Sequence, residues 1–350
     1  MASSSRALDL RVGDLVEVRS EDEILRTLDS RGALDSLPFM PEMLQFCGKR
    51  FRVYKGAHKA CDTIDWGTQR RIENAVHLEG VRCDGGAHDG CDADCLVYWK
   101  EAWLKPVTDS SDDSMRASSA DEVARDALGD TTCTREALTA STRTEDESGD
   151  VVFSCQATEL VRASVSPIPW WALWQYVSDI RSGNAGVGSV VRGLAVGFFN
   201  KLQKANVRLA PRLTLIRGGR TYPFVQGQLK GKTPGSGDLG LEPGELVEVK
   251  SKEAIFATLN EHDRTRGLRF DGEMLQFCGR RGRVQRRVGR IIDEKTGRML
   301  PITSDSILIE GFVCPGTYHR SCPRASPLWW RENWLERVDE QVEGETAHLD

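Results

Sequence analysis

The chain contains two copies of one segment. Residues 13–107 align with residues 244–338 at a constant offset of 231 positions and without an insertion. A block of seven residues, EMLQFCG, is identical at 42–48 and at 273–279. Two diverged copies must each fit the same fold. Residues kept in both copies are therefore expected to serve the fold, and residues kept in one copy are candidates for function or for drift.

Each copy is predicted to be mainly β. Leu15–Val18 and Arg50–Tyr54 alternate apolar and polar residues, as strands with one buried face do. A short helix is expected over residues 22–28, with Ser20 near its cap, because apolar residues recur there at helical spacing. Three further strands are predicted in the first copy, over 76–80, 97–99 and 103–107.

The Gly-Asp opening at Gly13 and the closing strand with Trp103 resemble SH3-like barrels. The nearest likeness is to the KOW-type and nitrile-hydratase β-subunit-like barrels, and similar tandem proteins occur among bacterial sequences. The resemblance implies a mainly β fold class with some α, in which two small duplicated barrels flank a mixed α/β middle segment. It implies no particular activity, because small barrels perform many unrelated tasks.

Five regions are expected along the chain. They are a first barrel with a Cys/His loop (8–107), an acidic disordered linker (108–150), a basic aromatic middle region with helices (151–237), a second barrel with a Cys/His loop (238–338) and a flexible tail (339–350). The linker prediction rests on twelve acidic residues against four arginines and on the lack of aromatic residues. Such a composition buries too little apolar surface to offset the entropy of the chain. In the middle region we expect a strand over Val151–Phe153 and a helix beginning after Pro169.

The strongest chemical signal is a loop that carries three thiols and one imidazole within thirteen residues. Its members are Cys83, His88, Cys91 and Cys95. Sulfur and imidazole ligands this close together suit tetrahedral zinc, with iron or another transition metal as the alternative. Cys61 could instead complete the site with the three cysteines and leave His88 as an outer ligand. The alternative without metal is one or two buried cysteines and a surface histidine.

The second copy departs from the first in this loop. It keeps three members, Cys314, His319 and Cys322. Ser326 stands in place of Cys95, and Ile292 stands in place of Cys61. A fourth ligand would come from elsewhere, such as Cys155 or Cys133, or three ligands would leave the open position that catalytic zinc sites use. Loss of the metal in this copy is the third interpretation.

Other residues kept in both copies are interpreted as fold residues. Cys47 and Cys278 stand in the same Phe-Cys-Gly context and are expected to be buried as small apolar side chains. Four tryptophans on the closing strands are expected to be barrel core rather than a binding groove. They are Trp99, Trp103, Trp330 and Trp334.

The middle region has an unusual charge distribution. No acidic residue occurs from Ile180 to Gly237, a stretch with ten cations. Six of these are candidate anion-binding residues: Arg208, Arg212, Arg217, Arg220, Lys230 and Lys232. Such a segment attracts nucleic-acid phosphates, anionic lipid or an acidic peptide, and the aromatic cluster over 170–176 could lie at a membrane surface. Neutralisation by the acidic linker is the simplest alternative.

The sequence favours a metal-stabilised binding or scaffold protein whose partner is a protein or peptide. It contains no glycine-rich nucleotide loop, nucleophile elbow or zinc-protease motif. A metalloenzyme with the second copy as its reactive site is the alternative, and nucleic-acid binding is disfavoured by the net charge of -5. A cytoplasmic location without a membrane-spanning segment is expected, because the chain has neither a signal peptide nor an apolar run of about 18 residues.

Overall fold

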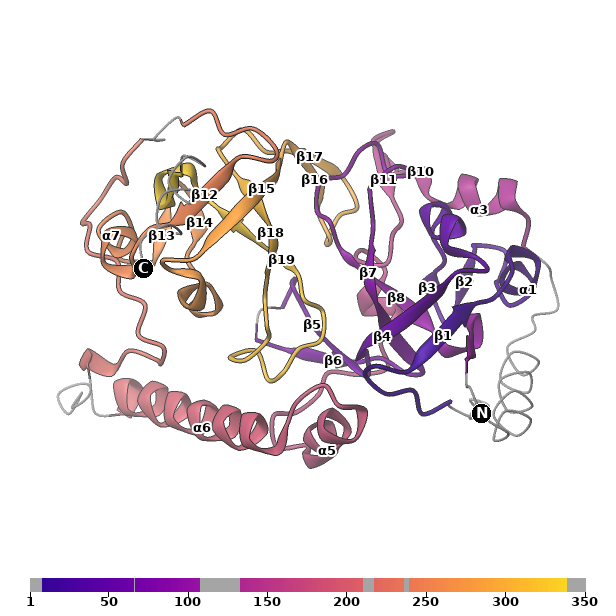
Figure 1. The fold of residues 1–350 in the computed structure, drawn as a ribbon, viewed down its shortest axis with the longest axis horizontal. Helices are drawn as coiled ribbons and strands as arrows, with labels where there is room; N and C mark the ends of the chain where they lie inside the picture. Colours follow the sequence, from indigo (N-terminus) through magenta and orange to yellow (C-terminus); the bar gives the residue numbers. More distant parts are fainter. Residues whose placement is uncertain (1–7, 66, 108–132, 210–216, 236–238, 339–350) are drawn as a thin grey trace, which may run out of the picture. The chain divides into compact units, whose positions relative to one another are not determined.

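The computed structural model of this 350-residue chain describes residues 8–65, 67–107, 133–209, 217–235 and 239–338. These residues form two units. The first unit contains the described residues up to Val191 together with 290–300 and 319–325, and the second contains the rest. Each unit holds one curled, five-stranded half-barrel sheet (Figure 1). The protein is therefore mainly β with some helix, as the sequence predicts.

The first sheet is antiparallel and has the order β8-β7-β4-β1-β9. Its strands are β1 (Leu15–Val18), β4 (Arg50–Gly56), β7 (Ala75–Arg82), β8 (Leu96–Lys100) and β9 (Leu104–Pro106). Two hairpins accompany it, β2 (Ala33–Leu34) with β3 (Leu37–Pro38), and β5 (Lys59–Cys61) with β6 (Gln69–Arg71). The helical turns between the strands are α1 (Glu21–Leu25) and the 3₁₀-helices η1 (Pro41–Phe46) and η2 (Glu101–Trp103).

The second sheet repeats this topology in the order β19-β18-β15-β12-β20. Its strands are β12 (Leu246–Val249), β15 (Arg281–Arg287), β18 (Ile307–Val313), β19 (Pro327–Trp330) and β20 (Leu335–Arg337). The accompanying elements are α7 (Lys252–Phe256), β13 (Arg264–Thr265), β14 (Leu268–Arg269), η5 (Gly272–Phe277), β16 (Arg290–Ile292), β17 (Met299–Pro301) and η6 (Glu332–Trp334). The register is also repeated: Leu15 faces Arg52, and Leu246 faces Arg283. The sequence repeat is therefore a repeat of topology and register.

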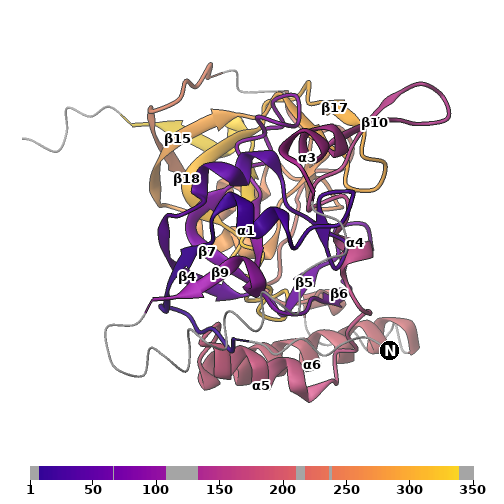
Figure 2. The same ribbon diagram turned by 90° about the vertical axis from the view of Figure 1, so that its right-hand side faces the viewer.

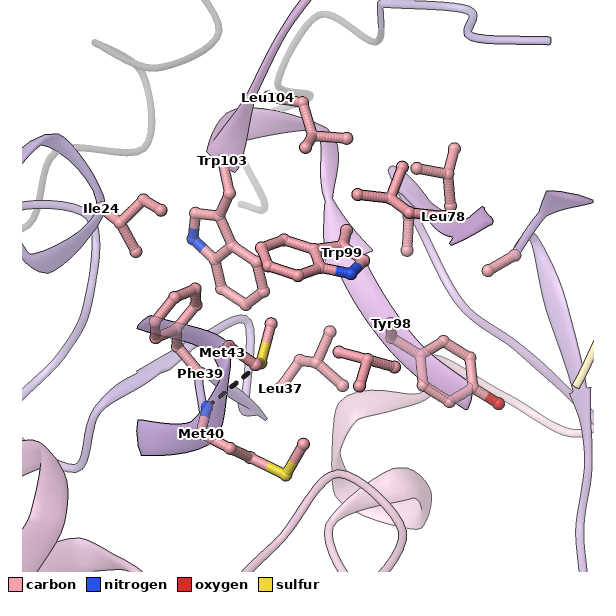
Figure 3. Close-up of a cluster of buried hydrophobic side chains, with 14 of the residues drawn as sticks. Ile24, Leu37, Phe39, Met40, Met43, Leu78, Tyr98, Trp99, Trp103 and Leu104 are labelled. Atoms are coloured by element: carbon pink, nitrogen blue, oxygen red, sulfur yellow. Dashed lines mark hydrogen bonds between the residues drawn. The ribbon is translucent and has the colours of Figure 1, made fainter. Parts of the chain in front are cut away.

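The four closing tryptophans form the centre of the two cores, which confirms the prediction that they serve the fold. Trp99, Trp103, Trp330 and Trp334 are all 0% exposed. In the first unit the ring of Phe39 meets Trp103 edge to face at 5.2 Å (Figure 3). In the second unit Phe270 meets Trp334 in the same way at 5.3 Å. Such edge-to-face contacts stabilise the cores beyond the contribution of the buried apolar area.

Two smaller predictions about the copies are partly right. Ser20 caps α1 as expected, because its hydroxyl accepts from the amide of Glu23 and the Glu23 carboxylate accepts from the amide of Ser20. The helix is shorter than predicted and ends at Leu25. Cys47 and Cys278 pack against the two cores but are half-buried rather than buried, since each follows the end of a 3₁₀-helix instead of lying on a strand.

The middle of the chain contributes α3 (Arg135–Ser141), β10 (Arg143–Glu145), β11 (Val151–Phe153), α4 (Leu160–Ala163), α5 (Leu173–Ser182), α6 (Val187–Leu209) and the 3₁₀-helix η4 (Arg217–Gly219). Strand β11 has the predicted bounds. Helix α5 begins at Leu173, later than predicted, because Gln175 donates to the Pro169 and Ala172 carbonyls and holds a turn there. No helix of the described residues is long and apolar enough to cross a membrane.

The prediction of a disordered linker over 108–150 is wrong for its second part. Helix α3 lies there, with Thr134 as its cap, and Figure 2 shows α3 on the side of the first unit nearest to the viewer. Leu138 anchors this helix in the first core and is fully buried. The acidic composition of residues 108–150 as a whole does not indicate that Leu138 is buried. Residues 108–132 and the tail 339–350 lie outside the described residues.

Candidate metal centre

Three side chains of the first unit converge on one point. They are Glu42 of η1, and Cys83 and His88 of the loop that follows β7. Oε1 of Glu42 lies 2.7 Å from Nδ1 of His88 and 3.3 Å from Sγ of Cys83. One ligand atom from each residue lies within 4.8 Å of the others. Carboxylate, thiolate and imidazole are the three side-chain ligand types that zinc uses.

The loop reaches this geometry through a tight turn at Gly85. Its φ angle is +73°, and a Cβ atom there would lie 2.2 Å from the carbonyl oxygen of Cys91. The Gly85 carbonyl accepts from the amides of His88 and Gly90, at 3.0 Å each. These contacts fold the loop back on itself and bury His88, whose side chain is 1% exposed. The glycines therefore serve to bury the histidine rather than to expose the loop.

The hydrogen bonds of His88 leave room for a cation. Nε2 of His88 lies 3.2 Å from the carbonyl oxygen of Ser154, so this nitrogen must carry the proton and donate. In a neutral ring Nδ1 is then an acceptor, and it faces the carboxylate of Glu42, which is also an acceptor. Two acceptors at 2.7 Å require a proton or a metal ion between them. A carbonyl acceptor on the second nitrogen is typical of metal-binding histidines.

The pKa values of the three groups follow from the same contacts. Burial alone would raise the pKa of Glu42, but the hydrogen bond and charge of His88 outweigh it and lower that pKa. Burial alone would lower the pKa of His88, and Glu42 in turn raises it. Burial and the neighbouring Glu42 carboxylate raise the pKa of the Cys83 thiol. A divalent cation would reverse this last effect, because a thiol that coordinates a metal loses its proton.

The residues fit zinc on two further observations. Oε2 of Glu42 is buried and has no hydrogen-bond partner among the described residues. An unpaired carboxylate oxygen in such a place costs free energy that a cation would recover. The 3.3 Å between Oε1 of Glu42 and Sγ of Cys83 matches the ~3.3–3.8 Å between ligand atoms that bonds of about 2.0–2.3 Å produce around a tetrahedral ion, whereas the 2.7 Å to Nδ1 of His88 is a hydrogen-bond distance and is shorter. A small expansion of the group would admit the ion.

A cavity of about 50 Å³ adjoins this group. Cys83 and His88 line it, together with other side chains of the first unit that include Cys91, Cys95 and Cys155. The volume is room for about three to five water molecules or one small ligand. A ligand set of three protein residues leaves one position of a tetrahedral ion for such a molecule.

The structure places the other predicted ligands around this centre rather than in it. Cys91, Cys95 and Cys155 line the cavity, and none belongs to a close ligand group among the described residues. Burial raises the pKa of Cys95 to about 12 and that of Cys155 to about 11, so both carry protons near neutral pH. Cys61 lies elsewhere in the unit, where its amide donates to Sγ of Cys322 at 3.1 Å.

The second copy has the same three residue types at the equivalent positions. Glu273, Cys314 and His319 each stand 231 positions after their counterparts. Glu273 accepts from the amide of Tyr318 at 2.5 Å. Cys322 does not belong to this group, because it lies against Cys61 in the first unit.

The sequence interpretation missed Glu42 and Glu273 as candidate ligands. Both belong to the identical EMLQFCG block, which was assigned to the fold alone. The signal was present, since each is the one acidic residue of that block. In η1 and η5 the block turns this carboxylate inwards, and the Glu42 side chain is 5% exposed.

The candidate anion-binding residues do not form one site. Arg220 pairs with Asp263 at 3.6 Å and donates to the Val225 carbonyl at 3.0 Å. Arg217 lies over the ring of Phe224. Three others are exposed, Arg208, Lys230 and Lys232, and Arg212 lies outside the described residues.

Comparison of the chain with models of protein families, with curated protein sequences and with solved structures gives no match. The geometry of the site is therefore the basis for any functional conclusion.

Proposed function

We propose that this protein is a metal-stabilised binding protein that holds zinc at Glu42, Cys83 and His88. The observation that carries the proposal is the meeting of a buried carboxylate with the acceptor nitrogen of His88, since the two need a proton or a cation between them. The repeat extends the proposal to Glu273, Cys314 and His319. Each copy would then bind one ion.

The proposed role of the ion is to fasten the Cys/His loop to the 3₁₀-helix of its own sheet. Glu42 comes from η1, whereas Cys83 and His88 come from a loop that has no strand or helix of its own. Each half-barrel is small, and small domains often depend on a metal or a disulfide because their cores are limited. Metal binding then contributes directly to the free energy of folding.

We propose a protein or peptide as the binding partner. Helix α5 and the turn before it present large apolar side chains to solvent, with Trp171 66% and Leu173 71% exposed. Exposed aromatic side chains are enriched at protein interfaces, where they supply contact area at low entropy cost. Nucleic acid stays the weaker expectation, because the cations of the middle region do not gather into one site among the described residues.

Elemental analysis of the intact protein tests the proposal. The purified chain is expected to hold two zinc ions, and Glu42→Gln and Glu273→Gln are each expected to hold one. Glu17→Gln is the matched control, because Glu17 is a half-buried carboxylate of β1 that pairs with Arg50 instead. A protein that binds no metal at micromolar zinc contradicts the proposal. Iron bound in place of zinc would keep the site but correct the identity of its metal.

A metalloenzyme is the second candidate function, and the cavity beside Cys83 and His88 is the observation that favours it. Three protein ligands with one position open to a small molecule are typical of catalytic zinc. In cobalt-substituted protein, added thiocyanate should change the visible absorption if that position is open. An unchanged spectrum, with the ion bound, indicates a closed structural centre.

A further inference from the structure

Cys61 and Cys322 lie against each other within the first unit. The amide of Cys61 donates to Sγ of Cys322 at 3.1 Å. Cys322 is 4% exposed, and Cys61 is half-buried. All ten cysteines of the chain are among the described residues and are reduced. Two cysteines that are 261 positions apart in the sequence therefore lie side by side in the fold.

Two cations lie beside the pair. Nη1 of Arg324 donates to the Cys61 carbonyl at 3.3 Å, which fixes the arginine there. Nζ of the buried Lys59 donates to the carbonyl of Arg320, two positions before Cys322, at 2.6 Å. Cysteines in such electropositive surroundings are the nucleophilic ones.

The sequence repeat supplies an internal comparison. The positions equivalent to Cys61 and Cys322 are Ile292 and Cys91, and the structure repeats the contact there, with the amide of Ile292 3.4 Å from Sγ of Cys91. The amide–sulfur contact therefore belongs to the fold. The second thiol is specific to the pair of Cys61 and Cys322, because isoleucine occupies its position in the repeated contact. The arginine is also specific to this pair, because Ala93 stands at the position equivalent to Arg324.

We propose that Cys61 and Cys322 form a redox-active dithiol that a hydroperoxide oxidises to a disulfide. The burial of Cys322 selects a small oxidant, of which hydrogen peroxide is the simplest, over a protein disulfide. The pair is distinct from the proposed metal centre, because neither sulfur belongs to a candidate ligand group. The proposal therefore does not depend on the proposed function.

The reaction has two steps. In the first, the Cys322 sulfur attacks one oxygen of hydrogen peroxide; an S–O bond forms, the O–O bond breaks, and the hydroxide that leaves takes the thiol proton. In the second, the Cys61 sulfur attacks the resulting sulfenic acid of Cys322; an S–S bond forms, the S–O bond breaks, and water leaves with the thiol proton. Two thiols are oxidised by two electrons in total, and one peroxide is reduced to two waters.

Mapping of disulfides by mass spectrometry tests the proposal on the purified full-length chain. After treatment with hydrogen peroxide and alkylation, the expected product is one cross-linked peptide pair containing Cys61 and Cys322. Dithiothreitol should reverse the cross-link. Cys91→Ser, which changes the sulfur of the repeated contact, should leave the cross-link unchanged. Oxidation that spreads over the other cysteines before this pair reacts would overturn the proposal.

A second measurement assigns the roles of the two sulfurs. In Cys61→Ile, which places the residue of the second copy at this position, dimedone should trap a sulfenic acid on Cys322. Cys322→Ser should lose both the cross-link and the trapped sulfenic acid. Circular dichroism checks that both variants are folded. Trapping that is absent in the folded Cys61→Ile, or that persists elsewhere at the same rate in Cys322→Ser, contradicts the proposal.

Discussion

Nδ1 of His88 lies 2.7 Å from Oε1 of Glu42, although the two residues are 46 positions apart. The carboxylate comes from a 3₁₀-helix in the block that is identical in the two copies, and the imidazole comes from a glycine-rich loop. This contact joins that block to the candidate Cys/His loop. It changes the interpretation of the block, which supplies a candidate ligand as well as packing residues.

Removing the charge of Glu42 should remove the metal of the first centre. We expect Glu42→Gln to weaken zinc binding there by more than the roughly 10–100-fold that follows loss of an outer-shell partner, because a direct ligand is lost. Competition with a chromophoric chelator measures the affinity, and Glu17→Gln should match the unchanged protein. Equal affinity in Glu42→Gln and the unchanged protein would remove this residue from the ligand set.

The buried His77 should make the first unit sensitive to acid. Its ring is fully buried, Nδ1 lies 2.9 Å from the Val97 carbonyl oxygen, and burial lowers its pKa to about 3. The unfolded chain binds a proton at its ordinary pKa of about 6.5, so stability present above that pH falls as the pH drops towards 3. The loss should approach about 1.4 kcal/mol for each pH unit within this window.

His77→Leu should flatten this dependence, since Leu308 stands fully buried at the equivalent position of the second copy. Urea unfolding at pH 7, 5 and 4 measures the slope. His262→Leu, at an exposed histidine, is the control and should keep the slope of the unchanged protein. The same slope in His77→Leu would mean that other groups cause the acid sensitivity.

A buried hydrogen bond should stabilise both copies by similar amounts. Nε1 of Trp103 donates to Thr27 Oγ1 at 3.0 Å, and Nε1 of Trp334 donates to Thr258 Oγ1 at 3.0 Å. Thr27→Val keeps the shape but leaves the indole N–H unpaired, so we expect a loss of about 1–3 kcal/mol. Thr27→Ser retains the acceptor and should lose less. Thermal unfolding of the two variants compares them, and equal losses would count against the hydrogen bond.

Substitution of one partner of the buried ion pair between Lys59 and Asp179 should strongly lower the stability of the fold. Both side chains are fully buried, and Nζ of Lys59 lies 2.5 Å from Oδ2 of Asp179. Lys59→Met leaves a buried carboxylate whose remaining side-chain partner in the described part of the chain is His58, at 3.0 Å, and should cost about 3–5 kcal/mol.

The double variant Lys59→Met/Asp179→Leu should recover much of that loss, because no unpaired charge remains. Denaturant unfolding of the two single variants and the double variant forms the thermodynamic cycle. Additive losses would show that the two side chains act independently. The exposed pair of Arg31 and Asp29 offers a control, in which Arg31→Met should change stability by less than about 1 kcal/mol.

Local signals in the sequence were sufficient for the five strands of the first sheet and for the first helix cap. Alternation over Leu15–Val18 and the Ser20 cap depend on neighbours within a few residues, so one segment contains all the information. The error over α3 has the opposite cause. Leu138 is buried only because the core of the first unit lies beside it, and the composition of 108–150 cannot report that.

The sequence by itself determined that the chain is duplicated and that each copy is mainly β, and it singled out the Cys/His loop as the candidate site. The tertiary structure alone decided which of these side chains meet. Glu42 joins Cys83 and His88, and Cys322 leaves the loop of its own copy to meet Cys61, 261 positions away. The reason is physical: periodicity and spacing describe neighbours along the chain, whereas a ligand group or a thiol pair is made by contacts that only the folded backbone brings together.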